Sequence, residues 1–135
     1  MKHIFLFIAS FLFAININAQ DAKKLLKTAS KDFAKFNQNQ IENKDKLASA
    51  ISAINEAFDL EGTSDNAGAW NIKGEIYNGI ADAEMRQKLI NPEAKIEHDQ
   101  AAVTAATAFK MAIDKSSKKS HTKDALNGLK ETENH

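Results

Sequence analysis

Residues 70–77 have the sequence Trp70-Asn71-Ile72-Lys73-Gly74-Glu75-Ile76-Tyr77. On an α-helix, Trp70, Gly74 and Tyr77 fall at positions i, i+4 and i+7 and therefore share one face. The glycine between the two aromatic residues has no side chain, so a neighbouring helix can approach closely there. The pattern predicts a helix that packs tightly against a partner around Gly74.

The partner helix is predicted downstream, where Ala105, Phe109 and Ala112 are again spaced at i, i+4 and i+7. Small residues flank one aromatic residue, which suits a bulky side chain that enters the gap opposite a glycine. The two stretches together predict a helical hairpin.

The hairpin resembles the tetratricopeptide repeat, whose two helices carry the patterns W-x2-L-G-x2-Y and A-x3-F-x2-A. Two positions depart from the family, because Lys73 stands where leucine is usual and Ser117 where proline is usual. The resemblance implies an all-α solenoid of antiparallel hairpins that binds a protein or peptide segment on its concave face. The residues that carry over to that face are Asn71, Glu75 and Asn78. The alternative is that these three are ordinary polar surface.

A less complete hairpin is predicted upstream, over Asp21–Phe58. Asp21 is the expected N-cap of its first helix, which should end near Asn37. Its second helix repeats the small–large–small spacing at Ala50, Ile54 and Ala57. The two copies lie 55 residues apart (105 minus 50). A regular array has a period of about 34, so about 21 residues have been inserted.

The inserted residues are predicted to lengthen both helices of the downstream hairpin. Asn91-Pro92-Glu93 offers an N-cap, a proline at the first helical position and an acid in the first turn, so it predicts the start of a helix. Ala83–Ile90 and Pro92–Asp99 would then extend the pair outward. The apolar contact between them is expected from Met85, Leu89 and Ile96. The alternative is a mobile loop in the same place.

A short last helix is predicted to cap the array, with Ala125, Leu126 and Leu129 facing inward and a polar outer face. The basic run Lys115–Lys123 before it suits the end of the preceding helix. Contact with an anionic lipid or polymer is the alternative for this run. The expected fold is therefore about two hairpins plus a C-terminal capping helix.

The N-terminal residues 1–19 resemble a secretory signal peptide, with cleavage after Ala19. Lys2 supplies a positive start, and the apolar run Ile4–Ile15 is interrupted by Ser10 alone. A membrane span needs roughly 20 apolar residues, and this run is shorter. We therefore expect a helical domain over residues 20–135 that is periplasmic or secreted, with no membrane span in the mature chain.

The composition argues against several kinds of function. The chain has 135 residues, no Cys, and 18 basic against 18 acidic residues. Balanced charge makes nucleic acid a poor guess as partner. The three histidines of the mature chain lack the spacing of a metal site, and no cofactor is expected. They are His98, His121 and His135.

The favoured hypothesis is an exported bacterial scaffold that binds a protein or peptide and has no catalysis of its own. The alternative is a hydrolase or a small-ligand-binding helical bundle of the cell envelope that uses carboxylates and His98. Weak self-association is also expected, because Phe33 and Phe36 with Leu25 and Leu26 could leave part of an apolar surface open.

Overall fold

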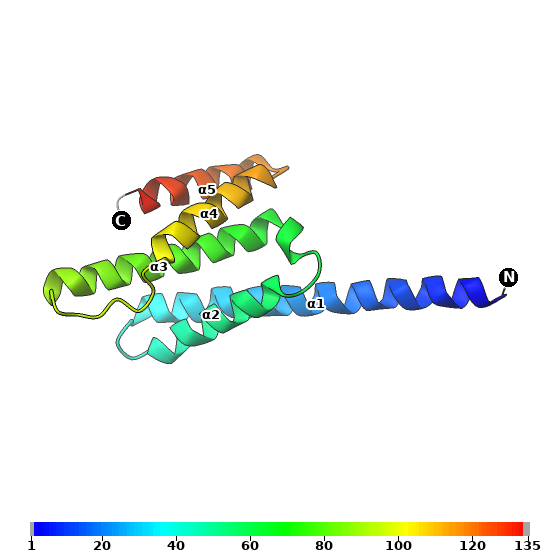
Figure 1. Ribbon diagram of the computed structural model, residues 1–135, viewed down its shortest axis with the longest axis horizontal. Helices are drawn as coiled ribbons and strands as arrows, with labels where there is room; N and C mark the ends of the chain where they lie inside the picture. Colours follow the sequence, from blue (N-terminus) through cyan, green and yellow to red (C-terminus); the bar gives the residue numbers. More distant parts are fainter. Residues whose placement is uncertain (1, 134–135) are drawn as a thin grey trace. The chain divides into compact units, whose positions relative to one another are not determined.

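A computed structural model describes residues 2–133, and it describes the side chains of residues 19–120 and 122–133. This part of the chain is helical and contains no strand, which confirms the all-α prediction. Its helices are α1 (Lys2–Gln38), α2 (Lys44–Phe58), α3 (Ala67–Ile90), α4 (Ala101–Asp114) and α5 (Lys119–Thr132) (Figure 1). A 3₁₀ turn, η1, covers Thr63–Asp65. The chain forms two compact units, residues 1–64 and 65–135.

The first unit is a hairpin of α1 and α2, which pack along each other. The turn between them is held by Asn39, whose side-chain Oδ1 accepts hydrogen bonds from the backbone N–H groups of Ile41 and Glu42, both at 3.2 Å. The small–large–small set on α2 is fully buried, and it consists of Ala50, Ile54 and Ala57. A hydrogen bond of 2.6 Å from the Ser49 hydroxyl to Asp32 joins the two helices.

The predicted start of the first helix is wrong. Asp21 lies inside α1 and does not cap it, because residues 19–24 contain no proline or glycine that would stop a helix. The predicted end near Asn37 agrees with the end of α1 at Gln38. The signal-peptide prediction falls almost wholly on residues whose side chains lie outside the described part, and it stays a prediction.

The open apolar surface predicted around Phe33 and Phe36 forms only in part, since Phe36 is 4% exposed. Its ring stacks on that of Phe33, with the ring centroids 6.3 Å apart. Phe33, Leu25 and Leu26 are half-buried. The predicted self-association stays a prediction.

The second unit begins at a defined N-cap. Gly62 takes a positive φ of 83°, which glycine adopts without strain. The side chain of Asn66 then accepts hydrogen bonds from the N–H groups of Gly68 and Ala69 at 2.8 and 3.2 Å, and α3 starts at Ala67. Helix α4 packs against α3, and α5 packs against both.

The centre of the second unit is the ring of Phe109, which is 1% exposed. The ring lies against the backbone of α3 at Gly74, where an added Cβ would stand 2.6 Å from ring carbons. It also lies against α5 at Gly128, whose added Cβ would overlap the ring. The surrounding residues are Ala105, Ala112 and Ala125, all fully buried, with half-buried Trp70, Tyr77 and Leu129. One aromatic ring therefore joins three helices.

The departure from the repeat pattern at residue 73 has a visible consequence. The Lys73 ammonium lies over the Trp70 ring, 5.7 Å from the ring centroid, which is within the range of a cation–π contact. A lysine thus contacts the aromatic face at a position where the pattern has leucine.

The prediction that Pro92–Asp99 is helical is wrong. Helix α3 does extend to Ile90, but residues 91–100 form an irregular connector and α4 begins only at Ala101 (Figure 1). Asn91 ends α3 in an extended conformation, and its side chain accepts the N–H of Glu93 in a local turn. The predicted apolar contact does not form, since Leu89 is 79% exposed.

The inward set predicted for the last helix needs one correction. Ala125 is buried and Leu129 half-buried, but Leu126 is 44% exposed and faces outward. The inward face of α5 instead includes Gly128 and Thr132. Within the described residues, no helix is both long and apolar enough to cross a membrane.

Candidate functional site

The three residues assigned to the concave face lie along α3 and meet polar residues of α5. Asn71, Glu75 and Asn78 are spaced at i, i+4 and i+7, so they follow one face of the helix beside the Trp70 row. Asp124 and Glu131 of α5 act electrostatically on Glu75. The contact between the two helices thus produces a polar surface, which we call the α3–α5 face, formed by Asn71, Glu75, Asn78, Asp124 and Glu131.

The amide nitrogens of both asparagines on this face are held by carboxylates. Asn71 Nδ2 donates to Glu75 Oε1 at 2.8 Å. Asn78 Nδ2 donates across to Glu131 Oε2 at 3.5 Å, which is the long limit of a hydrogen bond. The first contact is within α3, while the second links α3 to α5 and is weak enough to exchange for another partner.

The amide oxygens of the same two residues have no partner. Asn71 Oδ1 and Asn78 Oδ1 are both buried and accept no hydrogen bond from the described residues. An unsatisfied buried acceptor costs about 1–3 kcal/mol. Each side chain is only half-buried, so rotation of the amide about its Cβ–Cγ bond can bring the oxygen to the surface, at the loss of the hydrogen bond that Nδ2 donates to a carboxylate. The face therefore contains two acceptors that a bound N–H donor would satisfy.

Glu75 is the perturbed acid of the α3–α5 face. Partial burial of its carboxylate raises its pKa above the ordinary value, although much of the side chain is open to solvent. The hydrogen bond from Asn71 acts in the opposite direction, while the negative charges of Asp124 and Glu131 raise the pKa further. The native chain therefore holds a proton on Glu75 more readily than the unfolded chain does.

We expect the variant Glu75→Gln to be more stable than the wild type at neutral pH. With a raised native pKa, the stability that comes from protonation is fully present below the ordinary pKa and is lost as pH rises through the native pKa. Glutamine removes both the desolvated charge and its repulsion from Asp124 and Glu131. Urea unfolding from neutral pH down to about pH 4 measures this difference.

The stability advantage of Glu75→Gln should shrink as the pH falls. The matched control is Glu93→Gln, which changes an exposed carboxylate on the connector. Parallel pH curves for the wild type and Glu75→Gln would contradict the raised pKa.

The histidine of the alternative hypothesis serves as a structural contact. His98 Nδ1 lies 2.9 Å from Glu84 Oε1, and the backbone N–H groups of Glu97 and His98 donate to the same carboxylate oxygen at 3.1 Å. Glu84 therefore fixes the connector 91–100 onto α3. The sequence did not reveal this pair because Glu84 and His98 are 14 residues apart, which is outside any helical spacing.

The described residues contain no group of three or more His, Asp or Glu side chains that could hold a metal ion. The side chains of His121 and His135 lie outside the described part. Comparisons of the chain with protein-family models, curated proteins and solved structures give no match.

Proposed function

We propose that this chain is a helical scaffold without catalysis of its own, which binds an extended segment of another protein on the α3–α5 face. The observation that carries the proposal is the pair of unpartnered amide oxygens of Asn71 and Asn78. They lie seven residues apart on one side of α3, which is about 10 Å along a helix with a rise of 1.5 Å per residue. An extended chain rises about 3.4 Å per residue, so the two amides are separated by about three residues of a bound segment.

The chemistry of the face fits recognition of a peptide backbone. An asparagine amide both donates and accepts, so it can satisfy a backbone N–H and a backbone C=O of a bound segment. The carboxylates of Glu75, Asp124 and Glu131 favour a segment that also carries hydrogen-bond donors or positively charged side chains. Such a surface gives affinity through the main chain of the partner and requires no reaction.

The architecture we propose around this face is of the tetratricopeptide type. Helices α3 and α4 would be the two helices of one repeat, and α5 would be the first helix of the next, so that α3 and α5 line the concave side together. Support comes from the Phe109 ring, which lies against glycines of both α3 and α5. We further propose that the mature chain starts at Gln20 and works in the bacterial periplasm or outside the cell.

The test uses the full-length chain with a C-terminal tag, expressed in its native host and recovered from the cell envelope. Wild type is compared with the double variant Asn71→Ala/Asn78→Ala and with the control Gln87→Ala, an exposed amide on the same helix. We expect the affinity of the double variant for its main partner to fall by about tenfold, because two hydrogen bonds contribute about 0.5–1.5 kcal/mol each. The control should recover the same amount of partner as the wild type.

Two further measurements complete this experiment. Circular dichroism of each purified variant shows whether it folds, and the mass of the recovered wild type shows whether residues 1–19 have been removed. If the wild type and a folded double variant recover the same partners, the α3–α5 face is not the binding surface. A recovered chain that still carries residues 1–19 would remove export.

A further inference from the structure

Helix α5 has a second polar face, and its charge is opposite to that of the α3–α5 face. Residues at positions i, i+3, i+4, i+7, i+8 and i+11 along α5 form one continuous stripe: Lys119, Thr122, Lys123, Leu126, Asn127 and Lys130. This stripe lines a shallow groove with a volume of about 430 Å³, together with residues 116–118. The inward stripe of the same helix contains Ala125 and Gly128, so the groove lies on the outer side of α5.

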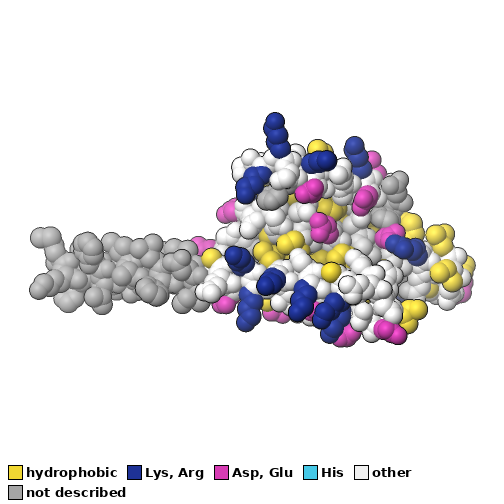
Figure 2. All heavy atoms as spheres, turned by 180° about the vertical axis from the view of Figure 1, so that it is seen from behind, with side chains coloured by type: hydrophobic (Ala, Val, Ile, Leu, Met, Phe, Trp, Pro, Cys, Tyr) yellow, Lys and Arg dark blue, Asp and Glu magenta, His cyan; other side chains and the backbone are white. Residues whose placement is uncertain are grey.

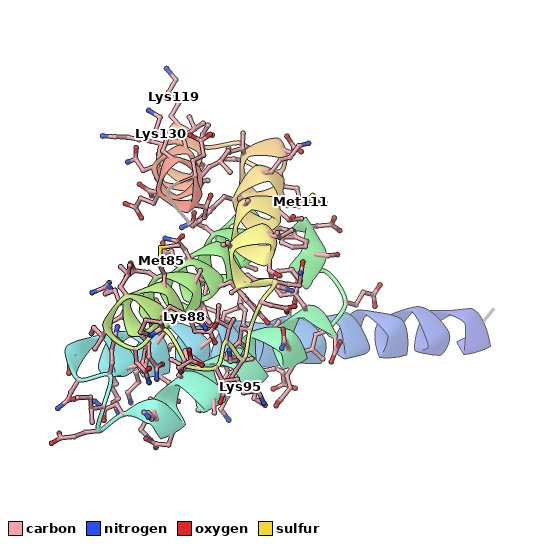
Figure 3. The ribbon with its side chains drawn as sticks, turned by 60° about the vertical axis from the view of Figure 1, so that its left-hand side comes forward. Met85, Lys88, Lys95, Met111, Lys119 and Lys130 are labelled. Carbon is pink, nitrogen blue, oxygen red and sulfur yellow. The ribbon has the colours of Figure 1, made fainter. Side chains whose placement is uncertain are left out.

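The groove is strongly basic although the chain as a whole is neutral. Its lining includes Lys118, Lys119, Lys123 and Lys130 but, among the described residues, no aspartate or glutamate. All four lysines are exposed. Figure 2 shows Lys and Arg side chains projecting from the surface over α5, and Figure 3 shows Lys119 and Lys130 pointing from α5 away from α3 and α4. The positive field is therefore concentrated on one side of α5.

The start of α5 adds to this field. The N-cap position is Lys118, which makes no side-chain capping bond, and the first turn contains no acidic residue. Most helix starts are neutralised by a polar cap or an acid because the backbone N–H groups there carry partial positive charge. The N-terminal end of the groove thus combines helix-end charge with Lys118 and Lys119.

We propose that this groove binds an acidic peptide segment in which carboxylates flank an apolar side chain. The lysines pair with the carboxylates, and Leu126, which is 44% exposed in the middle of the stripe, contacts the apolar side chain. Ser117 and Asn127 place a hydroxyl and an amide in the lining, where they can bond the peptide backbone. The surface is separate from the α3–α5 face, so it adds a second, acid-selective contact to the chain.

Two other anionic partners fit the groove less well. A single-stranded nucleic acid needs aromatic side chains on which its bases stack, and the lining contains none. A bilayer presents a broad surface of headgroups, whereas the volume of this shallow groove falls in the range of pockets for small ligands and short segments.

The test measures fluorescence anisotropy of a labelled short peptide in which Glu and Asp flank a central leucine, with the full chain as receptor. The reference probe is the same peptide with Gln and Asn in place of Glu and Asp. We expect binding of the acidic peptide that weakens as salt is raised, and little binding of the neutral one. Equal binding of both probes would overturn the proposal.

Variants locate the binding in the groove. Lys119→Glu/Lys123→Glu should weaken binding of the acidic peptide by at least about tenfold, because each reversal removes an attraction and adds a repulsion. The control Lys95→Glu/Lys110→Glu makes the same change of net charge at exposed sites outside the groove and should leave the affinity within about twofold. Equal losses in both double variants would mean a diffuse electrostatic effect and would overturn the assignment.

Two more outcomes separate the proposed ligand from its rivals. Leu126→Ser should lower the affinity for the peptide with a central leucine, because the lost contact is apolar. It should leave the affinity for a peptide with serine at that position unchanged. Sedimentation with phosphatidylserine vesicles should show no binding that depends on Lys119 and Lys123. Groove-dependent vesicle binding without peptide binding would assign the surface to lipid and overturn the proposal.

Discussion

The variant Phe109→Ala should lose about 3–5 kcal/mol of its free energy of unfolding, the usual cost of deleting a large buried aromatic side chain. The Phe109 ring is 1% exposed and touches α3 at Gly74 and α5 at Gly128. The two glycines have no side chain to move into the cavity, and the fully buried neighbours Ala105, Ala112 and Ala125 are small, so the cavity would be filled poorly. Small domains have total stabilities of about 5–15 kcal/mol, so a large part of the stability would be lost.

Urea unfolding followed by circular dichroism measures this loss, with Val103→Ala as the control. Val103 lies on the same helix α4 and is 61% exposed, so its truncation should change the stability by no more than about 0.5 kcal/mol. Similar small effects for the two variants would show that the Phe109 ring is not the centre of the second unit.

The second large effect is expected from adding one methyl group, in the variant Gly128→Ala. Alanine is normally about 1 kcal/mol better than glycine inside a helix. At residue 128, however, the new methyl group would overlap the Phe109 ring, and forcing extra atoms into a packed core costs about 1–3 kcal/mol. The overlap cost exceeds the propensity gain, so the variant should be less stable than the wild type by up to about 2 kcal/mol, against the sign that helix propensity gives.

A double-mutant cycle tests this explanation directly. When Phe109 is already alanine, the overlap is gone, so adding Gly128→Ala should become neutral or stabilising by up to about 1 kcal/mol. Gly74→Ala should behave in the same way, because its added methyl group would also meet the Phe109 ring. Destabilisation by Gly128→Ala of the same size in both backgrounds would mean that the ring is not the cause.

The local patterns of the sequence were enough to predict the helices and part of the packing. The periodicity of Trp70, Gly74 and Tyr77 predicted α3, because helical spacing depends on residues that are close in sequence. The small–large–small spacing around Phe109 predicted a ring that enters a gap opposite a glycine, and the structure places the ring against Gly74. For the candidate site, helical spacing also placed Asn71, Glu75 and Asn78 on one side of α3.

The rest depended on contacts between residues far apart in the chain, which no local period encodes. The connector 91–100 is irregular because Glu84 binds the backbone at Glu97 and His98, although Asn91-Pro92-Glu93 taken alone predicts a helix start. The Phe109 ring also contacts Gly128 of α5, a helix that sequence spacing did not link to α3.

The two proposed binding surfaces show the same division between local and tertiary information. Sequence spacing places Asn71 and Asn78 on one helix face, but their unpartnered oxygens exist only because the packed structure buries them. Sequence composition shows lysines in α5, but which side of that helix is open was decided when Ala125 and Gly128 packed against Phe109 and left Leu126 outside. Helix formation is governed by neighbours in sequence, whereas burial and pairing are governed by neighbours in space.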